Sequence, residues 1–164
     1  MLFSKTVECP GSVKSLTEML KNPRYYSQRW QDLDPKASVD INMGARQLRV
    51  TSALDISETT VASVSNLVNS GIQARVVEIW DLDTNGLATK GSISVSLAGV
   101  PAKASAALKI PVHEVPAEKT AIRIEGEVTC TIPLIGAGLE RAVIRRLDQA
   151  LTREIKVMKE FLGG

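Results

Sequence analysis

Residues 132–162 read IPLIGAGLERAVIRRLDQALTREIKVMKEFL, and this stretch decides the fold. No Pro or Gly interrupts it after Gly138, and apolar side chains recur every three or four positions. They are Leu139, Val143, Leu147, Leu151, Ile155, Met158 and Leu162. This spacing predicts one face of an amphipathic helix. A helix of about 24 residues is about 36 Å long, so its apolar face can be buried only against something equally extended.

The other face of this predicted helix is polar. Its residues are Arg141, Arg145, Asp148, Gln149, Arg153, Lys156 and Lys159. Acidic residues interrupt the basic ones at helical spacing, namely Glu140, Asp148, Glu154 and Glu160. We therefore expect a solvated face joined by ion pairs between positions i and i+4. Basic helices also attract anionic lipid, so transient contact with a membrane stays open as an alternative.

The chain before this helix is predicted to form seven short strands. They are Leu2–Cys9, Ser38–Asn42, Gln47–Asp55, Gln73–Leu82, Thr89–Leu97, Ala102–Val112 and Ile122–Ile132. Most alternate apolar and polar residues, which gives each strand a dry face and a wet face. Because short turns join consecutive strands, those strands must be antiparallel. The predicted organisation is one α+β domain over residues 1–164.

Two short helices are predicted between the first and second strands. Ser12 can cap the first, whose apolar residues lie within Val13–Leu20. The second is a helical turn that holds Tyr25, Tyr26 and Trp30. Further along, Ser57–Asn69 has diluted helical spacing and is interpreted as a short helix or an ordered loop.

Composition excludes several classes of protein. The 164 residues carry a formal net charge of +2, and basic residues are interleaved with acidic ones, so nucleic acid is not an expected partner. No run of about 18 apolar residues is present, so no transmembrane helix is expected. The N-terminus lacks the charged region and apolar core of a secretory signal. We therefore expect a cytoplasmic protein, and its oligomeric state is not indicated.

The few cysteines and the single histidine limit metal and redox chemistry. Cys9 and Cys130 form no CxxC pair, and His113 is the only histidine. A zinc site would lack its usual ligands, so we predict no metal and no cofactor. Free cysteine behaves as a small hydrophobic residue, and we expect both thiols to be free and buried.

The order of elements, together with the residues Ile132-Pro133-Leu134-Ile135-Gly136 and Leu139-Glu140, resembles the START-like superfamily, also called the SRPBCC or helix-grip fold. More narrowly, the chain is similar to an actinobacterial family of unknown function in that group, in which a tryptophan ends a middle strand, as Trp80 does here. The resemblance implies a seven-stranded antiparallel sheet curved around the C-terminal helix. It also implies an apolar cavity, which in relatives holds lipids, sterols or polyketides, and it supplies no catalytic motif.

The space between sheet and helix is the candidate site. Small residues on the helix-facing side of the strands, such as Ala102 and Gly126, leave volume unfilled, or they let the helix approach closely as native packing requires. Both interpretations stay open. If a cavity exists, its predicted lining is Tyr26, Trp30, Trp80, Ala104, Ala106, Leu147, Leu151, Ile155 and Met158.

Three functions are compatible with this pattern. The first is a non-enzymatic carrier or binding protein for a small hydrophobic molecule, which the expected apolar lining without an ionisable cluster favours. The second is an enzyme of the aromatase or cyclase type, which needs an acid or base inside the cavity. The inward positions of the last three strands carry none. Glu78 and Arg75 lie on opposite faces of one strand, so one of them could point inward, but a surface ion pair is the favoured interpretation. The third is a protein-interaction module that uses the outside of the sheet.

Overall fold

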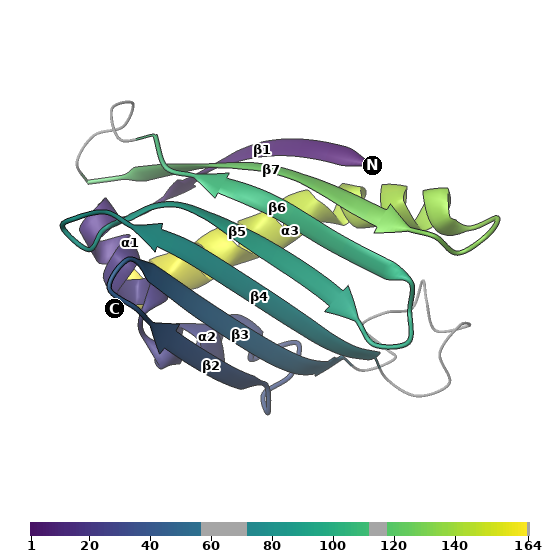
Figure 1. Ribbon diagram of the computed structural model, residues 1–164, viewed down its shortest axis with the longest axis horizontal. Coiled ribbons are helices and arrows are strands. Elements are labelled where there is room, and N and C mark those ends of the chain that lie inside the picture. The colour runs from purple at the N-terminus through teal and green to yellow at the C-terminus, as the bar shows by residue number, and fades with distance from the viewer. Residues whose placement is uncertain (57–71, 112–117, 164) are drawn as a thin grey trace.

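The computed structural model describes residues 1–56, 72–111 and 118–163. Seven antiparallel strands form one sheet in the order β1-β7-β6-β5-β4-β3-β2, and three helices accompany it (Figure 1). The elements are β1 (Leu2–Cys9), α1 (Val13–Leu20), α2 (Pro23–Trp30), β2 (Ser38–Met43), β3 (Gln47–Ile56), β4 (Ile72–Leu82), β5 (Ala88–Leu97), β6 (Ala102–Lys109), β7 (Thr120–Cys130) and α3 (Gly136–Gly163). The predicted α+β, helix-grip architecture is confirmed. The predictions for Ser57–Asn69 and His113 lie outside the described residues.

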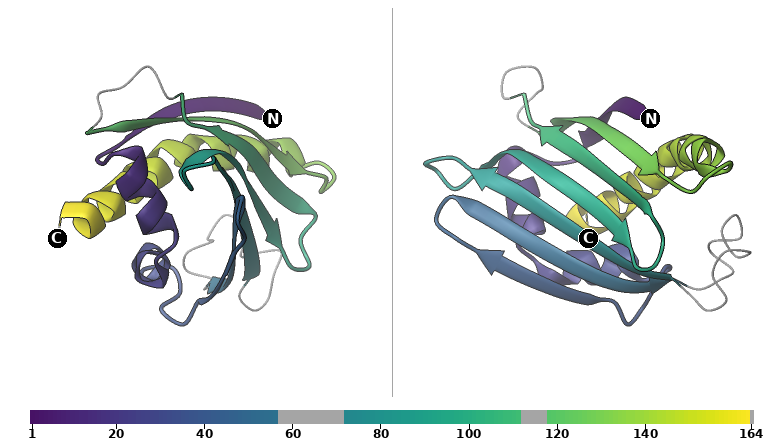
Figure 2. Two further views of the ribbon diagram at one scale, coloured as in Figure 1. Left: turned by 60° about the vertical axis from the view of Figure 1, so that its left-hand side comes forward. Right: turned by 45° about the vertical axis from the view of Figure 1, so that its right-hand side comes forward.

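The sheet curves, and all three helices lie on its concave side (Figure 2). α3 packs against β7 and β1, and α1 and α2 contact α3 as well. The contacts between α2 and α3 fall on the C-terminal half of α3, where Arg29 meets Glu154 and Gln28 meets Glu160. The N-terminal half of α3 is therefore covered on fewer sides.

Local sequence fixes where the two short helices begin. Ser12 caps α1 by accepting a hydrogen bond from the backbone N–H of Ser15 at 3.1 Å. Asn22 caps α2 in the same way through Arg24, and Pro23 occupies the first helical turn, where its missing N–H has no consequence. From α2, Arg29 reaches Glu78 of β4 and Tyr25 reaches Glu154 of α3.

The C-terminal helix is confirmed, but its apolar residues are not all buried and its polar residues are not all solvated. Val143 is 48% exposed, whereas Glu154, predicted to lie on the solvated face, contacts Arg29. Each residue turns the helix by about 100°, so the steps from Val143 to Glu154 end only about 20° beyond three full turns. Val143 and Glu154 thus lie on the same flank of α3. Only the part that carries Glu154 is covered by α2.

Other polar exceptions in the sequence have partners. Lys5, which interrupts the apolar side of the first strand, forms an ion pair with Asp148 of α3 at 2.7 Å. Cys9 and Cys130 are free and buried, as predicted, and burial raises the pKa of the Cys9 thiol. In the described ranges, no helix is long and apolar enough to cross a membrane.

Candidate functional site

A cavity of about 330 Å³ lies between the concave face of the sheet and α3. Its wall is mainly apolar and combines side chains from β1, the central strands, α1, α2 and α3. Seven of the nine residues named from the sequence lie around it: Trp30, Trp80, Ala104, Ala106, Leu147, Leu151 and Met158. Their role as ligand contacts stays a prediction.

Tyr26 and Ile155 are not among the residues that line this cavity. Tyr26 is fully buried, and its hydroxyl donates to the carbonyl of Leu20 at 2.7 Å, so it belongs to the core between α1 and α2. On α3, Ile155 is rotated by about 40° from Leu151 in one direction and Glu154 by about 60° in the other. The cavity lies on the side of Glu154.

Two glycines leave space for the aromatic rings of Trp80 and Phe3 at the cavity wall. A Cβ on Gly91 would lie 2.6 Å from the carbonyl oxygen of Ile79 and 3.0 Å from the indole of Trp80, the residue opposite Gly91 in the β4–β5 pairing. A Cβ on Gly126 would lie 2.5 Å from the ring of Phe3. The missing side chains therefore let both rings lie close to the sheet.

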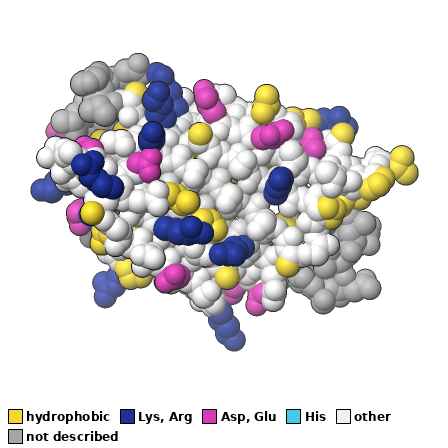
Figure 3. Space-filling view, in the orientation of Figure 1, with side chains coloured by type: hydrophobic (Ala, Val, Ile, Leu, Met, Phe, Trp, Pro, Cys, Tyr) yellow, Lys and Arg dark blue, Asp and Glu magenta, His cyan; other side chains and the backbone are white. Residues whose placement is uncertain are grey.

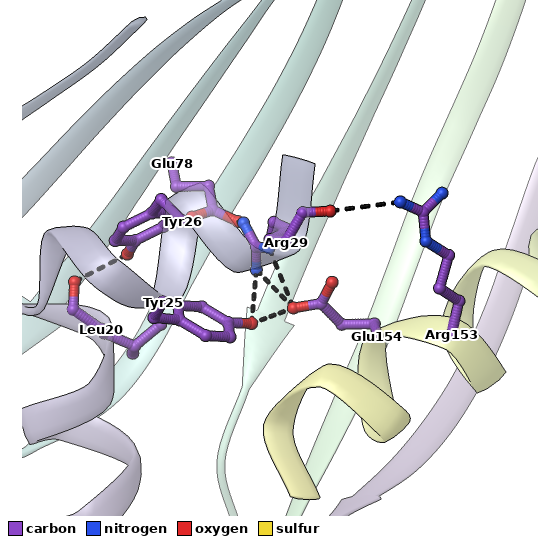
Figure 4. Close-up of polar contacts among 7 residues, drawn as sticks. All are labelled: Leu20, Tyr25, Tyr26, Arg29, Glu78, Arg153 and Glu154. Carbon is purple, nitrogen blue, oxygen red and sulfur yellow. Dashed lines mark hydrogen bonds and ion pairs between the residues drawn. The ribbon is translucent and has the colours of Figure 1, made fainter. Parts of the chain in front are cut away.

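A polar cluster lies at the end of the cavity that α2 closes (Figure 4). Its centre is Arg29, whose Nη1 donates to Oε1 of Glu78 at 2.8 Å. On the other side, Nε of Arg29 donates to Oε1 of Glu154 at 2.9 Å, and Nη2 donates to the Tyr25 hydroxyl at 3.0 Å. The Tyr25 hydroxyl in turn donates to Glu154. One guanidinium thus joins α2, β4 and α3.

Aromatic rings surround the same guanidinium. The Cζ atom of Arg29 lies 4.9 Å from the ring centre of Tyr25, 5.3 Å from that of Tyr26 and 5.4 Å from that of Trp30. Cations are attracted to the faces of aromatic rings at such distances. The rings therefore help to hold a charge that water reaches only slightly, since the Arg29 side chain is 11% exposed.

Burial changes the proton affinity of this cluster. Removal from water disfavours the charged carboxylate and raises the pKa of Glu154 to about 7. Burial, followed by the negative charge of Glu78, also raises the pKa of the Tyr26 phenol far above its ordinary value. At neutral pH, Glu154 is therefore a carboxyl group that can either give or take a proton at the cavity wall.

Two predictions about charge are wrong. The favoured surface ion pair is absent, because Glu78 is 4% exposed and binds Arg29, whereas Arg75 is exposed on the other face of β4. The alternative, in which one of the two points inward, is correct for Glu78. The cavity wall also contains a cluster of ionisable groups, although an uncharged lining was expected. Glu78 could have been placed from strand parity, because it shares its face with Val76 and Trp80. No pattern in the sequence indicated that Arg29 would lie at the cavity wall.

The sequence pattern of one protein family, described as "Protein of unknown function (DUF2505)", matches residues 4–162. The chain belongs to the DUF2505 family. No protein with a curated description matches it in sequence.

Solved structures show that this DUF2505 protein has the START-like fold, as the sequence predicted. The protein TTHA0849 from Thermus thermophilus is 13% identical, with 99% of this chain and 97% of that chain covered and a TM-score of 0.57. A START superfamily protein from Mycobacterium smegmatis is 13% identical, with 94% and 97% covered and a TM-score of 0.52. The Zhui aromatase/cyclase from Streptomyces sp. R1128 is 11% identical, with 99% and 93% covered and a TM-score of 0.58.

The outer face of the sheet in this DUF2505 protein offers a different surface. A shallow groove of about 820 Å³ runs over β1, β5, β6 and β7, between small side chains such as Ser94 and Ser105. Basic and acidic side chains are scattered over this face (Figure 3). Among the described residues, no three His, Cys, Asp or Glu side chains are grouped so that they could hold a metal ion.

Proposed function

We propose that the protein binds and carries a small hydrophobic molecule in the cavity between the sheet and α3. The observation that carries this proposal is the cavity itself, which has about 330 Å³ of space behind a mainly apolar wall. Sites for small ligands in proteins enclose about 300–1,000 Å³ and are mostly apolar with a few placed polar groups. The Arg29 cluster supplies such polar groups at one end.

The similar structures support the proposal at the level of the scaffold. One of them is an aromatase/cyclase, so the fold is compatible with a small-molecule site. Fold alone does not determine function. The carrier proposal therefore depends on the cavity of this chain, and its action in the cytoplasm stays a prediction from sequence.

A matched pair of substitutions on β6 tests whether the cavity holds the ligand. Ala104 lines the cavity and Ala107 lies exposed on the opposite face of the same strand. We expect Ala104→Phe to fill the cavity and Ala107→Phe to leave it open. Each protein is exposed to an organic extract of host cells and examined by native mass spectrometry.

The wild-type protein and Ala107→Phe should retain a bound small-molecule mass that Ala104→Phe lacks, while circular dichroism shows all three to be folded. An empty wild-type protein would contradict the proposal. If Ala107→Phe lost the bound small-molecule mass and Ala104→Phe kept it, the binding site would lie in the outer groove instead. That result would favour the interaction module.

A second candidate function is an enzyme of the aromatase or cyclase type. The observation that favours it is the carboxyl of Glu154, whose pKa of about 7 suits proton transfer at neutral pH. If this enzyme removes water from its substrate, the molecule recovered from Glu154→Gln should be heavier than that from the wild type by the mass of one water. Identical masses would favour the carrier.

Contact with a membrane is a further part of the carrier proposal. Leu134, between β7 and α3, is fully exposed and has a φ of 69°, and Ile135 beside it is 42% exposed. Figure 3 shows hydrophobic side chains projecting at this end of the molecule. The exposed Arg141 and Arg145 follow on α3. Apolar side chains next to cations suit an anionic lipid surface.

A further inference from the structure

Three buried polar atoms at the cavity wall have no hydrogen-bond partner among the described residues. They are Nε1 of Trp30, Nε1 of Trp80 and Oε2 of Glu78. All three side chains line the cavity. Trp80 is 3% exposed and Glu78 is 4% exposed. Buried polar groups in proteins are nearly always hydrogen-bonded, so three such atoms around one cavity indicate that something in the cavity pairs with them.

The chemistry of these atoms restricts what can pair with them. An indole N–H only donates, and a carboxylate oxygen only accepts. The ligand group that pairs with these atoms must accept a hydrogen bond from a tryptophan and donate one to Glu78. A hydroxyl group does both, whereas an ether or a ketone only accepts and an ammonium group only donates.

The charges at the wall disfavour an anionic ligand. Two basic residues line the cavity, Arg29 and Arg153. Arg29 is bound by the two carboxylates Glu78 and Glu154. Arg153 donates to the carbonyl of Arg29 at 3.3 Å and lies 3.5 Å from Asp32. Among the described residues, the wall therefore offers an anionic head group no cation that is without a partner already.

We propose that the ligand is a neutral apolar molecule with a hydroxyl group that donates to Oε2 of Glu78 and presents an oxygen acceptor to the indoles of Trp80 and Trp30. This inference rests on the proposed function, since it requires that the cavity take a ligand. It goes further by assigning a recognition role to Glu78 and by excluding fatty acids and phosphate-bearing lipids as the preferred class.

Four compounds that share one rigid hydrocarbon cage test separately whether the ligand must donate, accept or be neutral. They are 1-adamantanol, 1-methoxyadamantane, adamantane-1-carboxylate and adamantan-1-amine, which share the same apolar body and differ in the polar group. Binding is measured by isothermal titration calorimetry at pH 7. Because a hydrogen bond to a charged acceptor is among the stronger ones, we expect the alcohol to bind at least about tenfold more tightly than the other three.

Two substitutions assign the hydrogen bonds. Glu78→Gln replaces a carboxylate by an amide, and we expect the preference of alcohol over methyl ether to fall to about threefold or less. Trp80→Phe keeps a ring and removes the N–H. It should weaken the alcohol and the ether by a similar factor, because both accept, and leave the preference between them unchanged. Glu160→Gln, at an exposed position of α3 outside the cavity wall, is the control and should bind like the wild type.

The outcomes separate the inference from the proposed function. Binding of the ether, the carboxylate or the amine as tightly as the alcohol would overturn the inference and leave the carrier proposal standing. A preference for the alcohol that survives in a folded Glu78→Gln protein would overturn the role of Glu78. Failure of all four compounds to bind would overturn the inference, and an empty wild-type protein in native mass spectrometry would overturn the carrier proposal as well.

Discussion

Arg29 is the residue on which the polar end of the cavity depends. It faces two carboxylates, Glu78 and Glu154, at 2.8 Å each. One cation cannot neutralise two anions, and a net negative charge in a water-poor place is unfavourable. A proton on one carboxyl would leave the cluster neutral, which agrees with the raised pKa of Glu154.

The raised pKa of Glu154 makes stability depend on pH. Its pKa is about 7 in the folded protein and 4.5 as the ordinary value, so the folded state keeps a proton that the unfolded chain releases. This contribution is fully present below pH 4.5 and is lost as the pH rises through 7, by about 3 kcal/mol in total.

We therefore expect the free energy of unfolding of the wild type, relative to Glu154→Gln, to fall between pH 5 and pH 8. Urea unfolding at four pH values in this range measures it. Glu160→Gln, an exposed carboxylate on the same helix, should change little across the same range. A difference between wild type and Glu154→Gln that stays flat or rises with pH would contradict the assignment.

The site residues could be predicted where a simple rule of parity or periodicity applied. Ala104 and Ala106 lie at the cavity wall, on the face that strand alternation indicated, whereas the strand of Trp80 is apolar on both faces and alternation did not place it. Arg29 could not be found in this way. Its position depends on how α2 is rotated against β4 and α3, and a short helix with a charged residue among aromatic ones gives no signal of that rotation.

At the scale of elements, every described strand and helix was predicted, and the errors concern direction. Periodicity established that α3 is a helix, but not which of its flanks borders the cavity. That depends on the neighbour that covers each flank, as the pair Val143 and Glu154 shows. The reason is that α2 contacts only the C-terminal half of α3. On the same flank, Val143 is therefore exposed to water, whereas Glu154 contacts Arg29 of α2.

The pairing of β4 with β5 depends on a small residue at position 91. A methyl group on Gly91 would lie 2.6 Å from the carbonyl oxygen of Ile79. This oxygen belongs to the backbone, so relieving the clash would require a shift of the strand. We expect Gly91→Ala to lower the free energy of unfolding by about 1–3 kcal/mol and to shift the fluorescence of Trp80, measured in a Trp30→Phe background.

Ser92→Ala, on the exposed face of the same strand, is the matched control and should change stability by less than about 0.5 kcal/mol. Equal effects of the two substitutions would show that the close approach at Gly91 does not determine the position of the indole.

At the scale of the whole molecule, one end differs from the rest. Leu134 and Ile135 are exposed beside cations at the start of α3, whereas Met43, which is 55% exposed, lies at the end of β2 on another part of the surface. This contrast gives a matched test of membrane contact, because each apolar residue can be replaced by the same charge.

We expect Leu134→Glu to reduce co-sedimentation with vesicles that contain anionic lipid by about tenfold, since inserting a leucine side chain contributes about 1.5–3 kcal/mol. Met43→Glu should leave co-sedimentation unchanged. Higher salt should weaken binding of the wild type, because it screens the arginines. Equal losses in the two variants would contradict a specific contact surface at the start of α3.

The pairing of β1 with β7 has a consequence for biosynthesis. Leu2 lies opposite Glu127 and Cys9 opposite Thr120, so the first strand finds its neighbour only after more than a hundred further residues have left the ribosome. Contacts this distant in sequence slow folding, and a nascent chain keeps unpaired strand edges meanwhile, which favours aggregation. Since α3 follows all seven strands in the chain, the cavity between α3 and the sheet can form only after α3 has left the ribosome, and a ligand can be enclosed there only after that point.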